Sequence, residues 1–241
     1  YSKTLFYKFI MGDFKNLGLK KEIIEAVHRI QIRETTDVQD KIIPLSLQKK
    51  NIVFTSMTGS GKTLAFSIGF LGRINKKLDT QMLVIVPTRE LCIQVANEIE
   101  RLCKPLNLSV VKIFGGRDMD IDKNMLMKKK HIIVATPGRL IVYINEKKIK
   151  LGEVKLLVFD ESDQMFDNGF YDDCAYIRSR VAMHSQIILS SATISDRVEE
   201  FIKNEIDDYE LLKIGLNIPK NIVQERIDCK ISAKNKLLLK I

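Results

Sequence analysis

The feature that most constrains this chain is a short apolar run that leads directly into a loop with two glycines. Residues 51–55 read Asn-Ile-Val-Phe-Thr, and residues 56–63 read Ser-Met-Thr-Gly-Ser-Gly-Lys-Thr ahead of a long apolar segment. This order predicts a strand, a loop and a helix, the context in which such a loop binds phosphate. Glycines let backbone N–H groups turn towards phosphate oxygens, and the start of the helix adds partial positive charge.

The end of this loop supplies two side chains with different chemistry. Lys62 can reach the β- and γ-phosphates of a nucleotide, and Thr63 carries a hydroxyl suited to ligate Mg²⁺. Ser56 stands where the usual pattern has its first glycine, so the match is imperfect. An ordinary glycine-rich turn is the alternative, and a carboxylate partner further along the chain would argue against it.

Composition limits the class of protein. The chain has 241 residues, of which 45% are hydrophobic and 29% charged, as in a globular protein of one or at most two domains. No apolar window is long enough for a membrane span and no secretory signal is evident, so we expect an intracellular protein, nuclear or cytoplasmic. The four cysteines form no Cys-x-x-Cys pair and are expected to be reduced thiols. A net charge of +9 suits a polyanionic partner, although a merely basic globular protein explains it equally well.

From residue 51 onward, apolar runs alternate with helical patterns. In the clearest helix, Glu90–Lys104, the apolar residues form one stripe. The alternation predicts an α/β domain with a mostly parallel central sheet and helices on both faces. Ligands of such sheets bind beyond the carboxyl ends of the strands. The predicted strands are Ile52–Thr55, Met82–Val86, Val110–Phe114, His131–Ala135, Lys155–Phe159, Gln186–Ser190 and Glu210–Ile214.

The strand predicted at Lys155–Phe159 delivers acidic residues at its carboxyl end, in the order Asp160-Glu161-Ser162-Asp163. Asp160 is suited to hold a Mg²⁺ that bridges two phosphates, and Glu161 to orient or deprotonate an attacking water. An acidic cluster alone favours a capped turn. Its combination with Lys62 and Thr63 favours a nucleotide site.

Three further strand ends offer backbone amides or basic side chains. Thr136 and Pro137 suit the start of a helix, which would leave the amides of Gly138 and Arg139 free to bind a phosphate. Each segment alone is compatible with a turn or helix start, but together along one sheet edge they predict a track for a sugar-phosphate backbone. The segments are Pro87-Thr88-Arg89, Gly115-Gly116 and Thr136-Pro137-Gly138-Arg139.

The strand predicted at Gln186–Ser190 is followed by more hydroxyl groups. Ser191 and Thr193 could bond to the acidic loop at Asp163, or hydroxyls here could cap a helix that begins near Ser195. The residues alone leave both interpretations open.

With these motifs in this order, the chain resembles the first RecA-like domain of DEAD-box ATP-dependent RNA helicases. The resemblance covers essentially the whole chain. In chain order, the matching segments are Phe14 and Gln39 (Q motif), Ser56–Thr63 (motif I), Pro87–Leu91 (motif Ia), Gly115-Gly116, Thr136–Arg139 (motif Ib), Asp160–Asp163 (motif II) and Ser191–Thr193 (motif III).

The resemblance implies a P-loop NTPase fold that uses ATP and Mg²⁺. It implies that Gln39 reads the adenine edge and that Phe14 stacks on the ring. It also implies that Asp163, Ser191 and Thr193 couple hydrolysis to the separation of RNA strands. The residues that it assigns to the nucleotide are Phe14, Thr36, Gln39, Ser56, Met57, Thr58, Gly59, Ser60, Gly61, Lys62 and Thr63, with Lys62, Asp160 and Glu161 as the catalytic set and Thr63 and Asp160 at the metal.

The implied partner is RNA, bound through its backbone with little sequence specificity by a monomer, with RNP assembly factors as further partners. An ATP-dependent DNA helicase and an ATP-gated RNA clamp are the rival interpretations. Three departures from the family pattern are small: Ser162 and Ser56 each replace an alanine, and Thr35-Thr36-Asp37 replaces Pro-Thr-Pro.

The motifs also predict how the chain is divided. Residues 1–50 form the Q-motif region that leads into the core, and residues 51–214 form a RecA-like ATP-binding domain. Residues 215–241 are expected to be a linker and the start of a second RecA-like domain, extended at 221–230 and helical from 234. Because that second domain carries arginine fingers and half of the RNA surface in the family, we expect this chain alone to bind nucleotide and RNA weakly, with little turnover.

Overall fold

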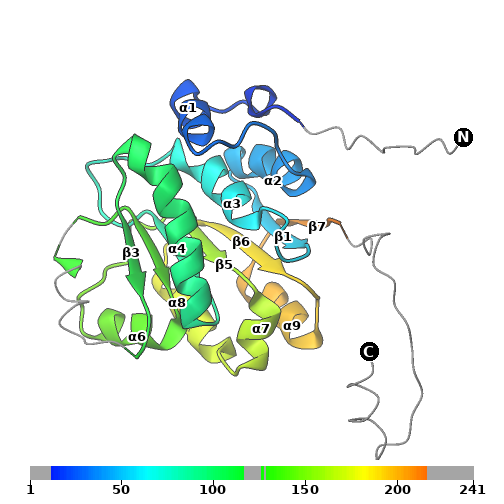
Figure 1. The fold of residues 1–241 in the computed structure, drawn as a ribbon. Helices are drawn as coiled ribbons and strands as arrows, with labels where there is room; N and C mark the ends of the chain where they lie inside the picture. The colour runs from blue at the N-terminus through cyan, green and yellow to red at the C-terminus, as the bar shows by residue number, and fades with distance from the viewer. Residues whose placement is uncertain (1–11, 117–125, 128, 216–241) are drawn as a thin grey trace, which may run out of the picture.

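Seven parallel strands form one sheet through the middle of the protein (Figure 1). The computed structural model describes residues 12–116, 126–127 and 129–215. The strands lie in the order β3-β4-β2-β5-β6-β1-β7. Their bounds are β1 (Asn51–Thr55), β2 (Met82–Ile85), β3 (Val110–Ile113), β4 (Ile132–Ala135), β5 (Leu156–Phe159), β6 (Gln186–Ser191) and β7 (Tyr209–Lys213). Each strand predicted from the sequence is therefore confirmed, with ends that shift by one residue at most.

The continuous apolar runs reflect burial on both faces of the sheet. Every residue of β2, β4 and β5 is buried, whereas the edge strand β7 is largely exposed. Successive strand residues alternate between two hydrophobic clusters, so that Ile52 and Phe54 join one cluster and Val53 joins the other. The alternation of strands and helices thus predicts the layered architecture correctly.

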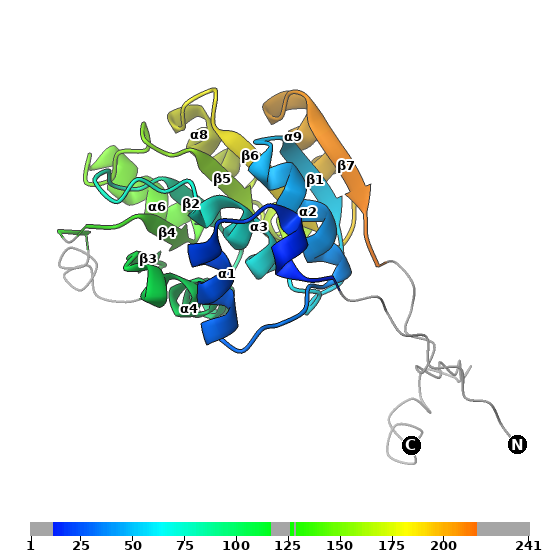
Figure 2. The ribbon, with the colours of Figure 1, turned by 90° about the horizontal axis from the view of Figure 1, so that it is seen from above.

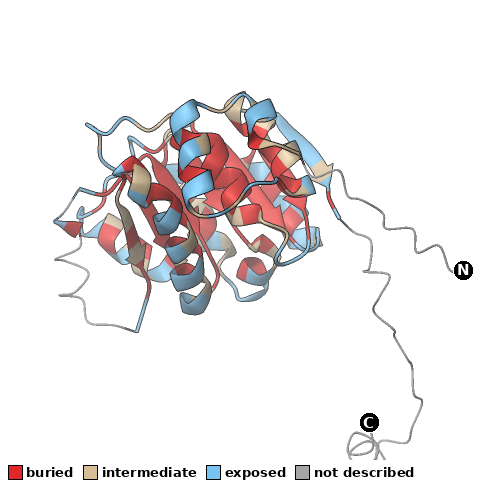
Figure 3. Ribbon diagram, turned by 45° about the horizontal axis from the view of Figure 1, so that its top comes forward, coloured by how far each residue is buried: buried red, intermediate tan, exposed pale blue. Residues whose placement is uncertain are grey.

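Helices cover both faces of the sheet. Residues of α1 to α4 pack into the first hydrophobic cluster, and residues of α6 to α9 pack into the second. Figure 2 shows α1 and α4 on the opposite side of the sheet from α8 and α9, and Figure 3 shows the buried strands between these layers. The helices are α1 (Lys21–Arg29), α2 (Asp37–Leu47), α3 (Lys62–Leu71), α4 (Arg89–Cys103), α6 (Pro137–Asn145), α7 (Ser162–Asp167), α8 (Tyr171–Arg180) and α9 (Asp196–Glu205), with short 3₁₀ turns η1 (Phe14–Leu17) and η2 (Lys104–Leu106).

The ends of the chain leave part of the domain prediction outside the structure. The strand β7 ends at Lys213, and the backbone N–H of Ile214 still donates to the Thr55 carbonyl at 2.9 Å. The extended segment expected at 221–230 and the helix expected from 234 lie outside the described residues. In the described part of the chain, no helix has the length and apolar character needed to cross a membrane.

Candidate nucleotide and nucleic-acid site

The carboxyl ends of the strands bring the predicted motifs to one edge of the sheet. The phosphate-binding loop follows β1, and the acidic segment follows β5. The Ser-Ala-Thr segment starts at Ser191, the last residue of β6, and continues beyond that strand. The strands β5, β6 and β1 are neighbours in the sheet. The segments beginning at Pro87, Gly115 and Thr136 follow β2, β3 and β4, which are also neighbours. The edge therefore has a nucleotide half, formed by the ends of β1, β6 and β5, and an amide half, formed by the ends of β2, β4 and β3.

The loop between β1 and α3 has the backbone expected of a phosphate cradle. Gly59 and Gly61 have φ values of 76° and 88°, a left-handed conformation that glycine adopts without a steric cost. The helix α3 begins directly at Lys62, which is 7% exposed and whose Nζ donates to the Met57 carbonyl at 3.5 Å. The free amides at this helix start and the lysine charge both favour an anion.

The start of α2 is tied to this loop. Thr36 and Gln39 form a capping box, in which Thr36 Oγ1 accepts from the Gln39 backbone N–H and Gln39 Oε1 accepts from the Thr36 backbone N–H. Thr36 Oγ1 also donates to the Ser60 carbonyl at 2.9 Å, and Gln39 Nε2 donates to the Gly61 carbonyl at 3.3 Å. The Q-motif segment and the phosphate loop are therefore one hydrogen-bonded unit.

A pocket of 540 Å³ opens where the start of α2 meets the phosphate loop. Thr36 and Val38 line one side, Met57 and Gly59 the other, and Ile214 also borders it. Its size is within the range of small-molecule sites. Gln39 itself is 2% exposed and lies behind this lining, between Val38 and Asp40, with its amide bonded to Thr36 and Gly61.

Phe14 corrects the expectation of a stacking aromatic. Its side chain is fully buried in the first hydrophobic cluster, beneath the layer that α1 and α2 form. A ring with no exposed face cannot stack on a base in this arrangement. The physical reason is that burying the ring gains hydrophobic free energy and anchors η1 against α2.

The acidic side of the site is buried. Asp160 is 3% exposed, and its Oδ1 accepts a short hydrogen bond from Ser190 Oγ. Burial raises the pKa of Asp160, while the hydrogen bond and the charge of Lys62 act in the opposite direction. Burial also raises the pKa of Glu161, and the charge of Asp160 adds to that shift.

A second pocket, of 350 Å³, lies on the other side of the phosphate loop and contains the predicted catalytic groups. Thr63 offers a hydroxyl and Asp160 a carboxylate, which are the oxygen ligands that Mg²⁺ prefers. Asp160 is a carboxylate buried beside Lys62, where burial disfavours its charged form, and a divalent cation bound with a nucleotide would stabilise that form. The pocket is lined by Thr58, Gly59, Gly61, Lys62, Thr63, Leu91, Gln94, Val95, Glu98, Asp160 and Glu161.

Sequence reasoning missed Gln94 and Glu98 in this pocket. Both lie within α4, on the segment assigned from its apolar stripe. The two residues are four positions apart, so they lie on the same face of the helix, but they match no sequence motif. Only the packing of α4 against α3 shows that this face borders the pocket.

The hydroxyls beyond β6 bond to the acidic segment. Asp163 Oδ2 accepts from both the backbone N–H and the Oγ1 of Thr193, each at 3.0 Å, and the Asp163 N–H donates to Ser191 Oγ at 3.3 Å. Ser195 precedes α9 but makes no side-chain cap. Of the two interpretations that the sequence leaves open, the structure therefore favours contact with the acidic loop.

The amide half of the edge also comes together. The Arg89 guanidinium lies 5.5 Å from the centre of the Phe114 ring, and a Cβ placed on Gly116 would lie 3.0 Å from Arg89 Nη1. Thr88 caps α4, with Oγ1 accepting from the Leu91 N–H at 3.2 Å. These contacts bring the ends of β2 and β3 within reach of one ligand.

The end of β4 supplies the last part of this half. Thr136 and Pro137 do begin α6, although the Thr136 side chain makes no cap hydrogen bond. A Cβ on Gly138 would meet no atom within 4 Å, so the space beside this residue is open. Arg139 Nη1 lies 3.4 Å from the Tyr143 hydroxyl.

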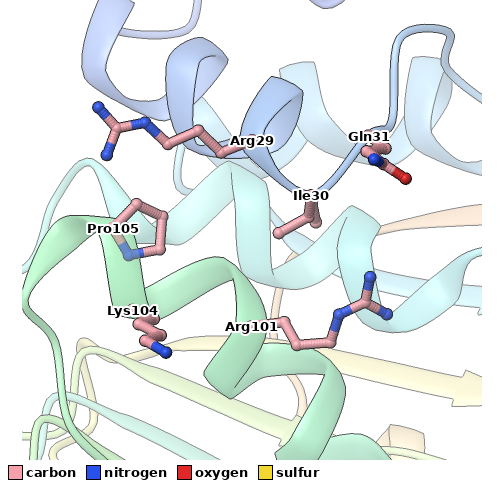
Figure 4. Close-up of a pocket in the computed structure, with 6 residues that line it drawn as sticks. All are labelled: Arg29, Ile30, Gln31, Arg101, Lys104 and Pro105. Atoms are coloured by element: carbon pink, nitrogen blue, oxygen red, sulfur yellow. The ribbon is translucent and has the colours of Figure 1, made fainter.

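Another pocket, of 440 Å³, lies at the C-terminal ends of α1 and α4, away from the site (Figure 4). The ends of these two helices explain its basic lining. Arg29, Arg101 and Lys104 line it, and the two arginines extend to opposite sides of Ile30. These cations belong to the last turns of α1 and α4 or follow them, where helix carbonyls carry partial negative charge. No acidic or nucleophilic side chain lines this pocket.

The sheet, the phosphate loop and the buried acidic strand end define a RecA-like P-loop NTPase. A family model described as DEAD/DEAH box helicase matches residues 36–201, and the chain belongs to this family.

Relatives and solved structures agree with this class. The chain is 40% identical over 205 residues to the DEAD-box ATP-dependent RNA helicase CshA of Geobacillus kaustophilus. This match covers 85% of the chain and 44% of the relative. It is 35% identical to the ATP-dependent RNA helicase CshA of Listeria monocytogenes, over 94% of this chain and 44% of the relative. A DEAD box protein from Methanococcus jannaschii has a similar structure, with a TM-score of 0.81 and 34% identity over 95% of this chain and 62% of that one. The chain thus spans less than half the length of these curated relatives.

Proposed function

We propose that the protein of which this chain is part is an ATP-dependent RNA helicase, and that this chain binds ATP–Mg²⁺ and one stretch of RNA backbone. The observation that carries the proposal is the order of the strands. It puts a phosphate loop with its acidic partner, and the glycine-bearing strand ends with Arg89, on one continuous edge. The relatives named as ATP-dependent RNA helicases support the same activity.

On the nucleotide half, each group has a distinct task. The amides of the loop and Lys62 bind the β- and γ-phosphates, while Thr63 and Asp160 would hold Mg²⁺. The metal, when bound, would neutralise charge that develops on the phosphates. Glu161, beside the same pocket, orients the water that attacks the γ-phosphate and accepts its proton.

The adenine is assigned to the 540 Å³ pocket at the start of α2. We assign the adenine edge to Gln39, which lies directly behind the pocket wall between Val38 and Asp40; its amide carries both a donor and an acceptor, which favours ATP over GTP. The apolar side chains of Val38 and Met57 and the fixed position of Thr36 shape the rest of the pocket.

On the amide half, the amides near Gly116 and Gly138 and the charges of Arg89 and Arg139 bind successive phosphates. Such contacts give affinity without sequence information. Asp163 and Thr193 then link the hydrolysis site to the movement that separates strands, because their hydrogen bonds join the ends of β5 and β6. We propose an intracellular monomer whose further partners are RNP assembly factors.

The proposal is tested by the ATP hydrolysis rate of the full-length protein, measured alone, with single-stranded RNA and with DNA of the same sequence. We expect stimulation by RNA only, and its loss in the Glu161→Gln variant. Equal stimulation by DNA would instead indicate a DNA helicase. Retention on RNA with a non-hydrolysable ATP analogue, without duplex separation in ATP, would indicate a clamp. For this chain alone we expect weak nucleotide and RNA binding with little turnover.

A further inference from the structure

A third carboxylate, besides Asp160 and Glu161, reaches the nucleotide pocket from the middle of α4. Glu98 lines the 350 Å³ pocket together with Lys62, Thr63, Asp160 and Glu161. Leu91 and Val95 line the same pocket, and the spacing of 91, 95 and 98 puts all three residues on one face of the helix. The position of Glu98 is therefore fixed by a regular helix and not by a loop.

Glu98 contacts the side chain that is assigned to the metal. The two residues line the same pocket across the contact between α3 and α4. Burial raises the pKa of the Glu98 carboxyl, and the nearby Thr63 hydroxyl, which can donate to that carboxylate, acts in the opposite direction. A threonine hydroxyl has one hydrogen and two lone pairs. With the hydrogen directed to Glu98, the lone pairs are left for a ligand on the pocket side.

The surroundings of Glu98 allow a carboxylate close to Asp160. The charge of Asp160 disfavours a second negative group, and the charge of Arg101, one turn further along α4, offsets part of this repulsion. A divalent cation in the pocket would reduce the repulsion further, since it would be attracted to both carboxylates. The site is therefore better suited to a nucleotide with its metal than to the nucleotide alone.

We propose that Glu98 is a positioning residue for the metal, which holds the Thr63 hydroxyl so that a lone pair faces the Mg²⁺ of bound ATP. The proposal rests on the proposed function, because it requires ATP–Mg²⁺ at the phosphate loop. Groups that orient a metal ligand typically change metal affinity by about 10–100-fold when they are removed. Glu98 thus acts through Thr63 and does not touch the reacting atoms.

The test is the binding of a fluorescent ATP analogue, mant-ATP, to the full-length protein as free Mg²⁺ is varied, with a parallel series in EDTA. We expect Glu98→Ala to raise the Mg²⁺ concentration for half-maximal binding by about 10-fold. Glu98→Gln keeps an oxygen that can accept from Thr63, so its Mg²⁺ requirement is expected to stay within about 3-fold of the wild type. In EDTA, neither variant is expected to bind mant-ATP more weakly than the wild type, because each removes a negative charge near the phosphates.

Two further variants separate a specific role from a general one. Glu100→Gln removes an exposed carboxylate from the same helix and is expected to leave the Mg²⁺ requirement unchanged. In a Thr63→Val background, Glu98→Ala is expected to add no further shift, because the hydroxyl it positions is gone. Melting temperatures of all variants report whether each one is folded.

An unchanged Mg²⁺ requirement in Glu98→Ala would overturn the proposal. So would additive shifts in the Thr63→Val background, or a Glu98→Gln variant that behaves like Glu98→Ala, since both would show an effect of charge and not of the hydrogen bond. Failure of the proposed function has a different appearance: the wild-type protein itself would not bind mant-ATP at any Mg²⁺ concentration.

Discussion

Gly61 is the residue at which the Q-motif segment and the phosphate loop meet, and any side chain there would be strained and crowded. Its φ of 88° is left-handed, and an added Cβ would lie 2.6 Å from Gln39 Nε2 and 3.2 Å from Thr36 Oγ1. We expect Gly61→Ala to lower the free energy of unfolding by about 2–3 kcal/mol, from backbone strain and the displaced amide together. We also expect it to weaken ATP binding at least about 10-fold, because Gln39 is moved.

Urea denaturation and mant-ATP titration measure these two effects. Gly59→Ala is the matched control, because Gly59 has a similar φ of 76° but a Cβ there would meet no atom within 4 Å. It should show only the strain, about 1–2 kcal/mol. Equal losses of stability in the two variants would argue against the contact with Gln39.

Thr193 is the residue whose loss should separate hydrolysis from strand separation. Thr193→Val removes one of the two hydrogen bonds that this residue donates to Asp163 and leaves the catalytic pocket intact. We expect ATP hydrolysis by the full-length protein to stay within about 3-fold, and duplex separation to fall at least about 10-fold, as for the loss of a charge-assisted hydrogen bond. Thr193→Ser keeps the donor and should restore unwinding. Parallel losses of both activities would show that Thr193 has no separate coupling role.

At the residue scale, the sequence predicts which residues carry the chemistry better than it predicts which side chains are buried. Lys62 and Asp160 could be assigned because strand ends and motif spacing fix their places. Phe14 and Glu98 could not, since the first is decided by how η1 packs and the second by which face of α4 meets α3. Lys130 is a similar case: within a run of lysines that suggests solvent, it is buried and pairs with Asp79 at 2.7 Å.

At the scale of the element, α4 carries a thiol whose burial should make the protein sensitive to alkaline pH. Burial raises the pKa of Cys103 to about 12, whereas an unfolded thiol has a pKa of about 8.5. Between these values the folded protein keeps a proton that the unfolded chain releases. The free energy of unfolding should therefore fall as pH rises, by about 1.4 kcal/mol per pH unit for this thiol.

Urea denaturation from pH 8.5 to 10.5 tests this sensitivity. The Cys103→Ala variant will be less stable throughout because it loses packing in the core. Its stability should nevertheless decline less steeply with pH than that of the wild type. Parallel declines would mean that the Cys103 thiol does not contribute.

Elements with a strong apolar pattern are predictable, and elements without one are not. The strands β1 to β6 and the helix α4 follow from apolar runs or a single stripe. By contrast, α8 buries only Cys174 and Ile177 among its ten residues, so its sequence gives no helical stripe. The order of the strands is also beyond the sequence, because alternation predicts parallel pairing but does not say which strands are neighbours.

At the scale of the whole molecule, the two halves of the edge should be separable by mutation. We expect Lys62→Ala to weaken ATP binding by about 10–100-fold with RNA binding in the absence of nucleotide unchanged. Arg89→Ala should weaken RNA binding by about 10-fold, with ATP binding unchanged, and should lower the salt dependence of RNA binding by about one phosphate contact. Fluorescence titrations of the full-length protein with mant-ATP and with labelled RNA measure both effects.

Arg180→Ala is the control for a loss of charge, because Arg180 is exposed at the end of α8, away from this edge. It should change neither affinity by more than about 2-fold, as for a distant surface charge. If a variant at Lys62 or Arg89 lowered the affinity for ATP and the affinity for RNA, each measured without the other ligand, the edge would be one shared site and not two halves.

The pairing of β1 also determines when the protein can fold during its synthesis. This strand is the first to be made, yet both of its neighbours, β6 and β7, are the last, and Ile52 pairs with Ile188 about 136 residues further along the chain. At about 5–20 residues per second, a ribosome needs roughly 7 to 27 s to make that interval. During this time the apolar side chains of Ile52, Val53 and Phe54 lack their strand partners. The phosphate loop is therefore among the last parts of the fold to form, and the nascent chain offers a hydrophobic segment to chaperones until β6 has left the ribosome.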